Sequence, residues 1–397
     1  MNGRPIGFDS RRAALQFWLF AAATFLYSLS TTMLALLSVI FKDAGLDERQ
    51  IGIVLSASAI PMIIATLCSG ALIGRIGAIP TAILGQIVVL ATFIGLQFAD
   101  HSFYGAVCCR IVQGVGLGLV VPAAMVFAKS RLNQERFVYY FGIYSSMMPL
   151  PNMFGPFIAE LYLQRFGVAG FFFVAGIPIL LGAVMAAAIG GGGGWTPKSS
   201  ASLGYLKLLT SRELRLPNVS ALIFGLIGGF APSFLALLLA QRGVSVSYFF
   251  STYTICMFGS RLLVFGRVQS LPREVIVAGG IGLGSIGYAL LIFAHGPAAT
   301  VLAGILFGLG QSVNYPTLSI WFSERFPPED RGRPVALFNT IYNLGVFLTP
   351  LFGGYVIAET GAEWLLAMLS LLGFGLLGFI GLRFAVRSSR GAAVAGD

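Results

Sequence analysis

Long apolar stretches alternate along this chain with short segments that carry most of its charged residues. Each stretch runs for about 20 residues or more, the length that a helix needs to cross the hydrocarbon core of a bilayer. Apolar and polar positions do not alternate strictly within them, so they predict helices and not the strands of a membrane barrel. Breaks at glycine, proline and charge clusters define twelve predicted spans, near 13–41, 51–73, 80–99, 103–129, 138–163, 168–189, 217–241, 246–266, 273–294, 298–322, 334–358 and 362–386.

Composition also indicates an all-α membrane protein. Hydrophobic residues make up 57% of the chain and charged residues 10%, whereas a soluble domain carries roughly 25% charged residues. The net charge of +10 comes from basic residues in short loops, a pattern typical of cytoplasmic loops and not of a nucleic-acid-binding surface. With the N-terminus inside, 19 of the 25 Lys and Arg fall on the cytoplasmic side. We expect a multi-pass protein of a bacterial inner membrane, surrounded by lipid, with both termini cytoplasmic and no nucleic-acid partner.

One longer break divides the twelve spans into two sets of six. It covers residues 190–216 and opens with the glycine run Gly190–Gly194, which is typical of a flexible connection. We therefore predict an N-terminal six-helix half at 1–189, a cytoplasmic glycine-rich linker at 190–216 and a C-terminal six-helix half at 217–397.

The two halves repeat a pattern of prolines. Pro122 and Pro156 recur 194 residues later as Pro316 and Pro350, and a run of small residues precedes the first proline of each pair. Repeated halves around a site at the bilayer midplane are typical of alternating-access transporters. Five prolines are expected to interrupt helical hydrogen bonding and to permit bends: Pro149, Pro151, Pro156, Pro316 and Pro350.

Several passages resemble motifs of the major facilitator superfamily, over essentially the whole chain. RIVQGVGLGLVVPAA, which starts at Arg110 in the fourth span, is similar to the RxxQGxG motif of that family. GALIGRIG contains Gly70, Arg75 and Gly77 and is similar to the loop motif between spans two and three, although Gly74 occupies its acidic position. NMFGPFIAE at 152–160 keeps the Gly-Pro centre of the antiporter motif.

In the second half, RLLVFGRVQSLPRE resembles the corresponding loop of the sugar- and drug-efflux-type branch and contains Arg261 and Arg267. Residues 306–332 are likewise similar to that branch. The resemblance implies twelve helices in two pseudo-symmetric halves. It also implies a secondary active transporter that exports a small molecule by alternating access, with proton antiport. Uptake by symport and facilitated diffusion remain alternatives, since no motif read physically encodes direction. We expect a gating role for the loop residues of both passages.

Arg110 lies about seven residues, roughly 10 Å, inside the fourth span. A cation at this depth is costly unless it faces a cavity or finds a partner, and Gln113 shares its helix face. Either Arg110 takes part in substrate binding or proton transfer, as the motif implies, or it clamps main-chain carbonyls; we favour the first. The glycines that follow, Gly114, Gly116 and Gly118, indicate close helix packing and not a dinucleotide loop, since no strand precedes them.

Polar side chains recur at helical spacing in the first, fifth, tenth and eleventh spans. In hydrocarbon such groups need partners, so the stripes face the protein interior or a water-filled cavity. Hydrogen bonds between helices are the alternative interpretation for each single residue. We expect the following side chains, with Arg110 and Gln113, to contact substrate: Tyr27, Thr31, Tyr144, Asn152, Gln311, Asn314, Tyr315, Asn339, Tyr342 and Asn343.

Acidic residues are absent from the middle of every predicted span. Glu160, near the outer end of the fifth span, is the candidate proton carrier, while Asp43 and Glu324 are interpreted as surface residues. Because Arg110 has no acidic neighbour in its own span, it favours an anionic or zwitterionic cargo. Our order of preference is a carboxylate-bearing metabolite, a zwitterionic metallophore, a sugar derivative and an amphiphilic drug.

The sequence indicates no cofactor and no metal site. Its four cysteines lie inside apolar runs without a CxxC pair, and only two histidines are present. No P-loop motif occurs, so ATP is not the expected energy source. An enzyme embedded in the membrane would need a catalytic cluster, and a sensor would need a sizeable soluble domain; neither is visible. We expect a monomeric transporter and not an enzyme.

Overall fold

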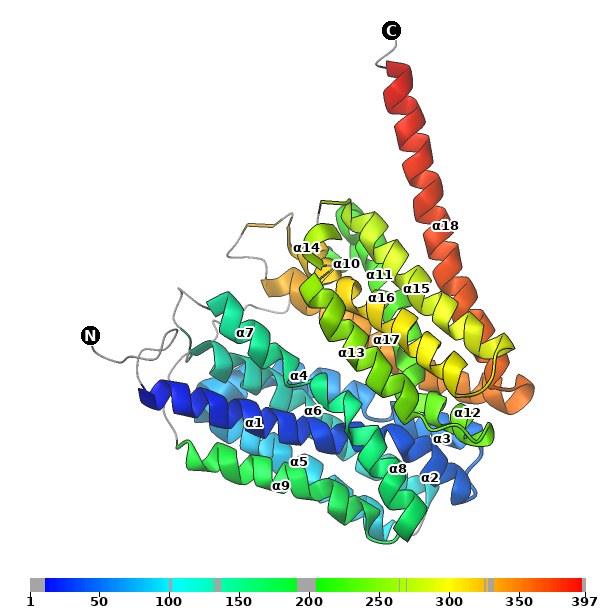
Figure 1. Ribbon diagram of the computed structural model, residues 1–397. Coiled ribbons are helices and arrows are strands. Elements are labelled where there is room, and N and C mark those ends of the chain that lie inside the picture. The colour runs from blue at the N-terminus through cyan, green and yellow to red at the C-terminus, as the bar shows by residue number, and fades with distance from the viewer. Residues whose placement is uncertain are drawn as a thin grey trace. The chain divides into compact units, whose positions relative to one another are not determined.

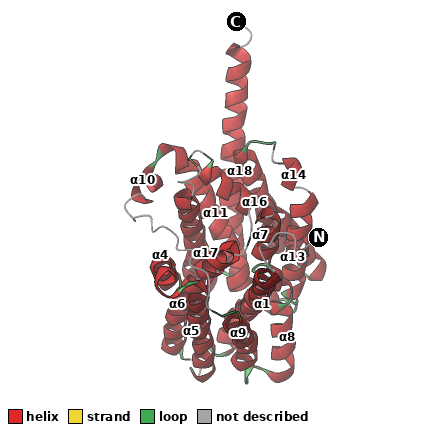
Figure 2. Ribbon diagram, turned by 90° about the vertical axis from the view of Figure 1, so that its left-hand side faces the viewer, coloured by secondary structure: helices red, strands yellow, loops and turns green. Residues whose placement is uncertain are grey.

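The chain is helical throughout the parts that its structure describes. The computed structural model describes residues 11–99, 102–130, 132, 137–190, 205–263, 265–268, 270–324, 326–327 and 332–394, and no strand occurs within those ranges (Figure 2). Residues 191–204, most of the predicted linker, lie outside them. The chain divides into two compact units, Met1–Ser200 and Ala201–Asp397.

The first unit contains the first six predicted spans, and its long helices run side by side as a bundle (Figure 1). Three of the six spans are interrupted. The elements are α1 (Arg11–Met33), η1 (Leu34–Leu36), α2 (Leu37–Asp43), α3 (Glu48–Ser56), α4 (Ala59–Ile76), α5 (Ala78–Phe98), α6 (Phe103–Ser130), α7 (Phe137–Ser146), η3 (Leu150–Met153), α8 (Gly155–Phe166) and α9 (Phe171–Ala188).

The second unit repeats this plan. Its elements are α10 (Tyr205–Thr210), η5 (Arg212–Leu214), α11 (Arg215–Phe230), the π turn η6 (Ala231–Leu235), α12 (Ala236–Gln241), α13 (Ser247–Leu263), α14 (Phe265–Val268), α15 (Arg273–Phe293), α16 (Pro297–Ser323), α17 (Gly332–Thr360) and α18 (Ala362–Val394). The pairs α11 with α17, α13 with α16 and α15 with both α16 and α18 pack together (Figure 1).

Nine helical stretches of the described chain are long and apolar enough to cross a membrane. The predicted fifth, eighth and tenth spans are helical as well but differ in character. The fifth is broken into α7 and α8, the described part of α13 covers 17 residues up to Leu263, and polar side chains lower the hydropathy of α16. The twelve predicted spans therefore all correspond to helical segments, which confirms the all-α membrane fold.

Only some of the prolines break their helices. Pro149 and Pro151 lie between α7 and α8, where the chain forms a turn and a short 3-10 helix. Pro316 and Pro350 instead lie inside the continuous helices α16 and α17, so the expected interruption does not occur there. A helix packed among others can lose one hydrogen bond at proline and still continue.

Glycine lets neighbouring helices approach closely at equivalent places in the two units. A Cβ atom built on Gly116 of α6 would lie 2.7 Å from the carbonyl oxygen of Gly85 on α5. Gly310 of α16 has the carbonyl oxygen of Gly280 on α15 in the same place. Since Gly310 follows Gly116 by the same 194 residues as the repeated prolines, the packing interpretation of the glycine run holds in both units.

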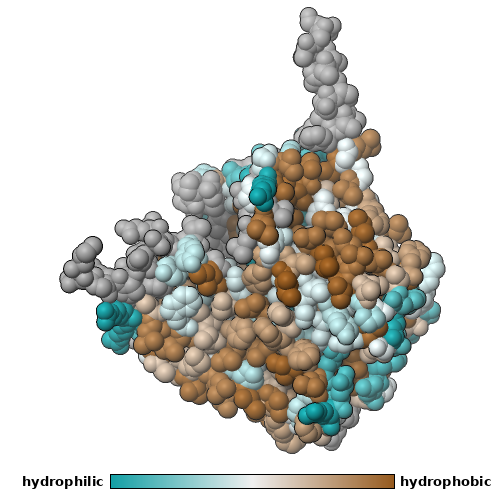
Figure 3. Space-filling view, in the orientation of Figure 1, coloured by the Kyte–Doolittle hydropathy of each residue, from teal (hydrophilic) through white to brown (hydrophobic). Residues whose placement is uncertain are grey.

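Large apolar side chains cover much of the face presented in Figure 3. Over the described surface as a whole, many Ile, Leu and Phe side chains are exposed, for example Leu67 on α4 at 65% and Leu371 on α18 at 69%. Patches of this extent would be unfavourable in water. They are the surface that a multi-pass protein presents to lipid.

Candidate functional site in the membrane helices

Arg110 on α6 holds the main chain of the second span. Its Nη2 donates to the carbonyl oxygen of Leu55 at 3.0 Å and its Nε to that of Val54 at 3.4 Å. A third bond runs from Nη1 to Oε1 of Gln113, which is 1% exposed. The predicted pairing of Arg110 with Gln113 on one helix face is therefore present, and two main-chain contacts add to it.

Those carbonyls accept from Arg110 because the second span is broken just after them. Helix α3 ends at Ser56, α4 begins at Ala59, and residues 57–58 form a turn. Pro61 explains the break, since it has no N–H and its ring crowds the carbonyl of Ala57, four residues before. Arg110 thus supplies donors where the helix ladder is interrupted, which is the arrangement of the clamp interpretation.

The clamp leaves much of the guanidinium's binding capacity available. A guanidinium has five N–H donors, and three bonds are formed here. Among the described residues, no acidic side chain forms an ion pair with Arg110. Its positive charge is half-buried and has no anionic partner among the described residues. An anionic group of a bound molecule could take this place.

Hydrogen bonds connect the polar stripe of α1 to the fifth span. The hydroxyls of Thr24 and Tyr144 lie 3.0 Å apart, and Ser28 donates to the carbonyl oxygen of Met148 at 2.5 Å. Thr24, Ser28 and Tyr144 are buried, as is Tyr27, whose hydroxyl has no hydrogen-bond partner within the described structure. In the first unit the stripe therefore joins α1 to the fifth span, and the Tyr27 hydroxyl is the group of the stripe that lacks a hydrogen bond within the described structure.

Among the described residues, the side chains of Thr31 and Asn152 form only local hydrogen bonds. Thr31 Oγ1 donates to the carbonyl oxygen of Ser28 at 3.0 Å, and Asn152 Nδ2 donates to that of Pro149 at 3.0 Å. Both side chains are half-buried. Asn152 therefore closes the turn that the two prolines open between α7 and α8.

The stripe of the second unit joins α16 to α17. The Tyr315 hydroxyl donates to Oδ1 of Asn339 at 2.5 Å, and Nδ2 of Asn339 and of Asn343 donate to main-chain carbonyls one turn earlier, at 2.9 and 2.8 Å. Tyr342 places its ring 5.1 Å from that of Phe224 and 5.6 Å from that of Tyr315. Tyr315 therefore links α16 to α17, and Tyr342 packs against both α11 and α16.

Gln311 and Asn314 line a small internal cavity of about 10 Å³ between α11, α15 and α16. That volume is about one water-sized sphere. Asn314 is 1% exposed and its Oδ1 has no hydrogen-bond partner among the described residues. Gly280 lies against this amide, where any larger residue would collide with it.

The predicted gating residues have different environments. Gly77 has φ +93° at the junction of α4 and α5, a conformation that favours glycine. Arg75 is exposed in the last turn of α4, and a Cβ atom at Gly70 would meet nothing within 4 Å. In the second unit, Arg267 is exposed on α14.

Arg261 on α13 is half-buried, and its Nε has no hydrogen-bond partner within the described structure. Arg267 Nη1 donates to the carbonyl oxygen of Leu263 at 2.5 Å. Glu160, the candidate proton carrier, is half-buried on α8.

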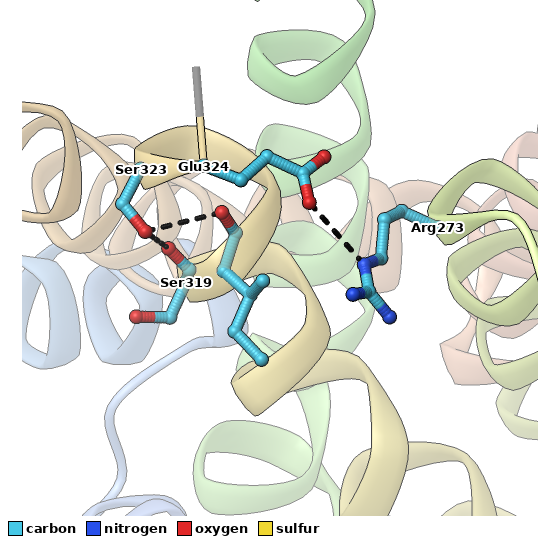
Figure 4. A network of polar contacts seen from close by, with 5 residues as sticks. Arg273, Ser319, Ser323 and Glu324 are labelled. Atoms are coloured by element: carbon cyan, nitrogen blue, oxygen red, sulfur yellow. Dashed lines mark hydrogen bonds and ion pairs between the residues drawn. The ribbon is translucent and has the colours of Figure 1, made fainter. Parts of the chain in front are cut away.

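An ion pair that the sequence did not predict links two helix ends of the second unit. Arg273 at the start of α15 places Nε 3.4 Å from Oε2 of Glu324, directly after α16, beside the Ser323 hydroxyl that bonds back to the carbonyl oxygen of Ser319 (Figure 4). Glu324 is at the surface, as the sequence predicts, and its side chain is 37% exposed. The sequence could have indicated this ion pair, because Arg273 and Glu324 carry opposite charges at the same predicted membrane interface.

The sequence profile of the Major Facilitator Superfamily matches residues 19–262 and 216–395. The staphylopine export protein of Staphylococcus aureus is 21% identical over 364 residues, which cover 83% of this chain and 86% of that protein. Quinolone resistance protein NorA of S. aureus and multi-drug resistance efflux pump PmrA of Streptococcus pneumoniae are each 23% identical, over 81% of this chain and 84% of each relative.

Solved transporter structures share the fold. A mutant of nucleoside transporter NupG has a TM-score of 0.81 at 12% identity, with 93% of this chain and 100% of that chain covered. A POT family transporter in complex with a thioalcohol conjugated peptide has a TM-score of 0.77 at 14% identity, with 95% and 96% covered. At these identities the likeness concerns the fold alone.

Proposed function

Because the chain belongs to the Major Facilitator Superfamily, we propose that it exports a small organic molecule that carries a carboxylate or another anionic group. Members of this family are secondary transporters of small molecules and not enzymes. Export is supported by the relatives, which are named for export, resistance and efflux. The fold alone carries no direction.

The half-buried charge of Arg110 is the observation that carries the proposed cargo class. No anion among the described residues pairs with it, and a cation in a membrane helix is unfavourable without one. A carboxylate binds a guanidinium with two parallel hydrogen bonds, and the side chain has donors to offer. A cationic cargo would instead meet repulsion at this position.

Exchange of partners at Arg110 provides the mechanical step of the proposal. When the anionic group of the cargo binds the guanidinium, the carbonyl of Leu55 loses its donor, while that of Val54 keeps the N–H of Ala57 at 3.4 Å. Helix α3 then changes its position relative to α4 about the turn at residues 57–58. Cargo binding is thereby linked to movement in the second span, as alternating access requires.

The proposed membrane location and topology are those that the sequence predicts. The protein lies in a bacterial inner membrane as a monomer, with halves at 1–189 and 217–397, a cytoplasmic linker between them and both termini cytoplasmic. The tyrosine and amide stripes contact the uncharged part of the cargo. Proton antiport is part of the proposal, with Glu160 as the carrier.

Facilitated diffusion is the second candidate, and one observation favours it. No Asp or Glu lies at mid-depth in any predicted span, so no buried carboxylate is available there to bind and release a proton. Accumulation against a gradient separates the two functions, because a facilitator brings the concentrations to equality and stops.

Comparison of metabolites inside and outside cells with and without the gene tests export. We expect an anionic or zwitterionic compound to accumulate inside the deletion strain and to leave the cells when the gene is restored. Everted vesicles that carry the protein should then concentrate this compound, and a proton ionophore should abolish the concentration step. Loss of the compound from deletion cells would instead identify uptake and overturn the proposal.

A further inference from the structure

A groove lies between α11 and α18 of the second unit, and none of the residues of the polar stripes lines it. Its volume is about 910 Å³, within the range of roughly 300–1,000 Å³ that small-molecule pockets occupy. Apolar side chains line most of its length, among them Val219 and Ile223 from α11 and Leu372 and Phe379 from α18. Val219 is 50% exposed and Phe379 is 52% exposed, so the groove opens toward the hydrocarbon.

Three arginines, Arg212, Arg215 and Arg383, complete the lining of this groove. Arg212 is the first residue of one candidate membrane span, and Arg383 is the first basic residue after the apolar run at 364–382 of α18. The basic groups therefore belong at one membrane interface, while the apolar lining extends from them into the bilayer. A lipid with a charged head group and an apolar acyl chain matches this arrangement of basic and apolar residues.

Within the described parts of the chain, the charges of these arginines have no anionic partner. No acidic side chain of the described residues forms an ion pair with them, and Glu213 in the same turn does not line the groove. The guanidinium of Arg383 lies 5.8 Å from the centroid of the Phe379 ring. The N-terminal end of α11 adds the positive end of its helix dipole beside Arg215.

We propose that this groove binds an anionic phospholipid. Its phosphate contacts Arg212, Arg215 and Arg383, and one acyl chain lies along the apolar lining of α11 and α18. Basic pockets between membrane helices on the cytoplasmic side recognise anionic head groups in this way. The arginines distinguish this occupant from a neutral lipid, and the apolar groove distinguishes it from a free phosphate.

The test uses the purified full-length protein, with native mass spectrometry and the thermal unfolding midpoint as readouts. The probes are phosphatidylglycerol, phosphatidylcholine with the same acyl chains, and glycerol phosphate, which supplies the head group alone. One variant combines Arg212→Ala, Arg215→Ala and Arg383→Ala. The other, Gly375→Leu, fills the groove, because a Cβ atom at this lining position meets nothing within 4 Å.

Matched controls are Arg165→Ala, an exposed arginine of the first unit, and Gly378→Leu, an open position on α18 outside the groove lining. We expect phosphatidylglycerol alone to remain bound and to raise the midpoint. The triple variant should weaken its binding on the order of a hundredfold, Gly375→Leu should also weaken it, and both controls should leave it unchanged.

Equal binding of phosphatidylcholine, or a response to glycerol phosphate that matches phosphatidylglycerol, would overturn the proposal. So would unchanged phosphatidylglycerol binding in Gly375→Leu, which decides the matter even where the triple variant does not fold. The result is independent of cargo and direction, since lipid binding requires no transport.

Discussion

Arg110 Nη2 donates to the carbonyl oxygen of Leu55 at 3.0 Å, across from the fourth membrane span to the second. This bond satisfies a carbonyl at the end of α3, where the helix is interrupted before α4. One side chain therefore carries both a half-buried positive charge without an anionic partner among the described residues and the support of a broken helix. The proposed transport step depends on this double role, because an anion that competes for Arg110 also releases the helix end.

Replacing Pro61 with alanine should make the second span continuous. The new N–H can bond the carbonyl of Ala57, and the carbonyl of Leu55 regains a helical donor in place of Arg110. We expect Pro61→Ala to keep or raise the thermal midpoint measured by circular dichroism and to slow transport in proteoliposomes. Pro80→Ala is the control, because Pro80 lies in the first turn of α5 where no helical N–H bond is lost. Transport at the original rate by Pro61→Ala would show that the helix break is not needed for transport and would contradict the proposed step.

Two tyrosines of the first unit form a matched pair for stability. Tyr144→Phe removes the hydroxyl that bonds Thr24 and should lower the free energy of unfolding by about 0.5–1.5 kcal/mol. Tyr27→Phe removes a buried hydroxyl without a partner in the described structure, so stability should be unchanged or higher. If that hydroxyl binds cargo, Tyr27→Phe slows transport at full stability. Equal destabilisation by both substitutions, in denaturant titrations, would contradict the assigned hydrogen bonds.

Close helix contact at glycine predicts a second stability difference. Gly116→Ala and Gly310→Ala each insert a methyl group against a main-chain carbonyl and should destabilise the protein by about 1–3 kcal/mol. Gly70→Ala has open space around the new Cβ atom and should leave stability unchanged. Thermal unfolding of the three variants in one detergent measures this. A stable Gly310→Ala protein would argue against equivalent packing in the two units.

The ion pair of Arg273 and Glu324 should contribute little to stability. Its side chains are 28% and 37% exposed, and exposed pairs contribute about 0–1 kcal/mol. A double-mutant cycle with Arg273→Ala and Glu324→Ala should give a coupling in this range that decreases as salt is added. A coupling of several kcal/mol that resists salt would instead indicate a buried latch.

The spans were predictable because their signal is local. An apolar run of about 20 residues is sufficient to predict a membrane helix, even for α16, where Gln311, Asn314 and Tyr315 reduce the hydropathy. The break before Pro61 was not predictable in this way. Pro316 also lies in an apolar run, yet α16 continues through it, so tertiary packing decides which proline interrupts a helix.

The candidate site was only partly predictable for a related reason. Arg110 and Gln113 could be paired by their spacing along one helix, but the carbonyls of Val54 and Leu55 leave no trace in the pattern of side chains. Spacing also placed Thr24 and Tyr144 in separate stripes, and only the packing of α1 against the fifth span brings their hydroxyls together. Contacts between distant segments depend on helix rotation, which periodicity alone does not determine.

Export by Arg110 variants tests the central claim most directly. The compound that accumulates in deletion cells is followed as it leaves those cells after restoration with the original protein, Arg110→Lys, Arg110→Ala or the exposed control Arg165→Ala, at equal membrane amounts. We predict that Arg110→Ala slows export roughly 10- to 1,000-fold, as expected for loss of a buried charge pair. Arg110→Lys should retain partial export and Arg165→Ala all of it. Export at the original rate by both Arg110 variants would contradict the account.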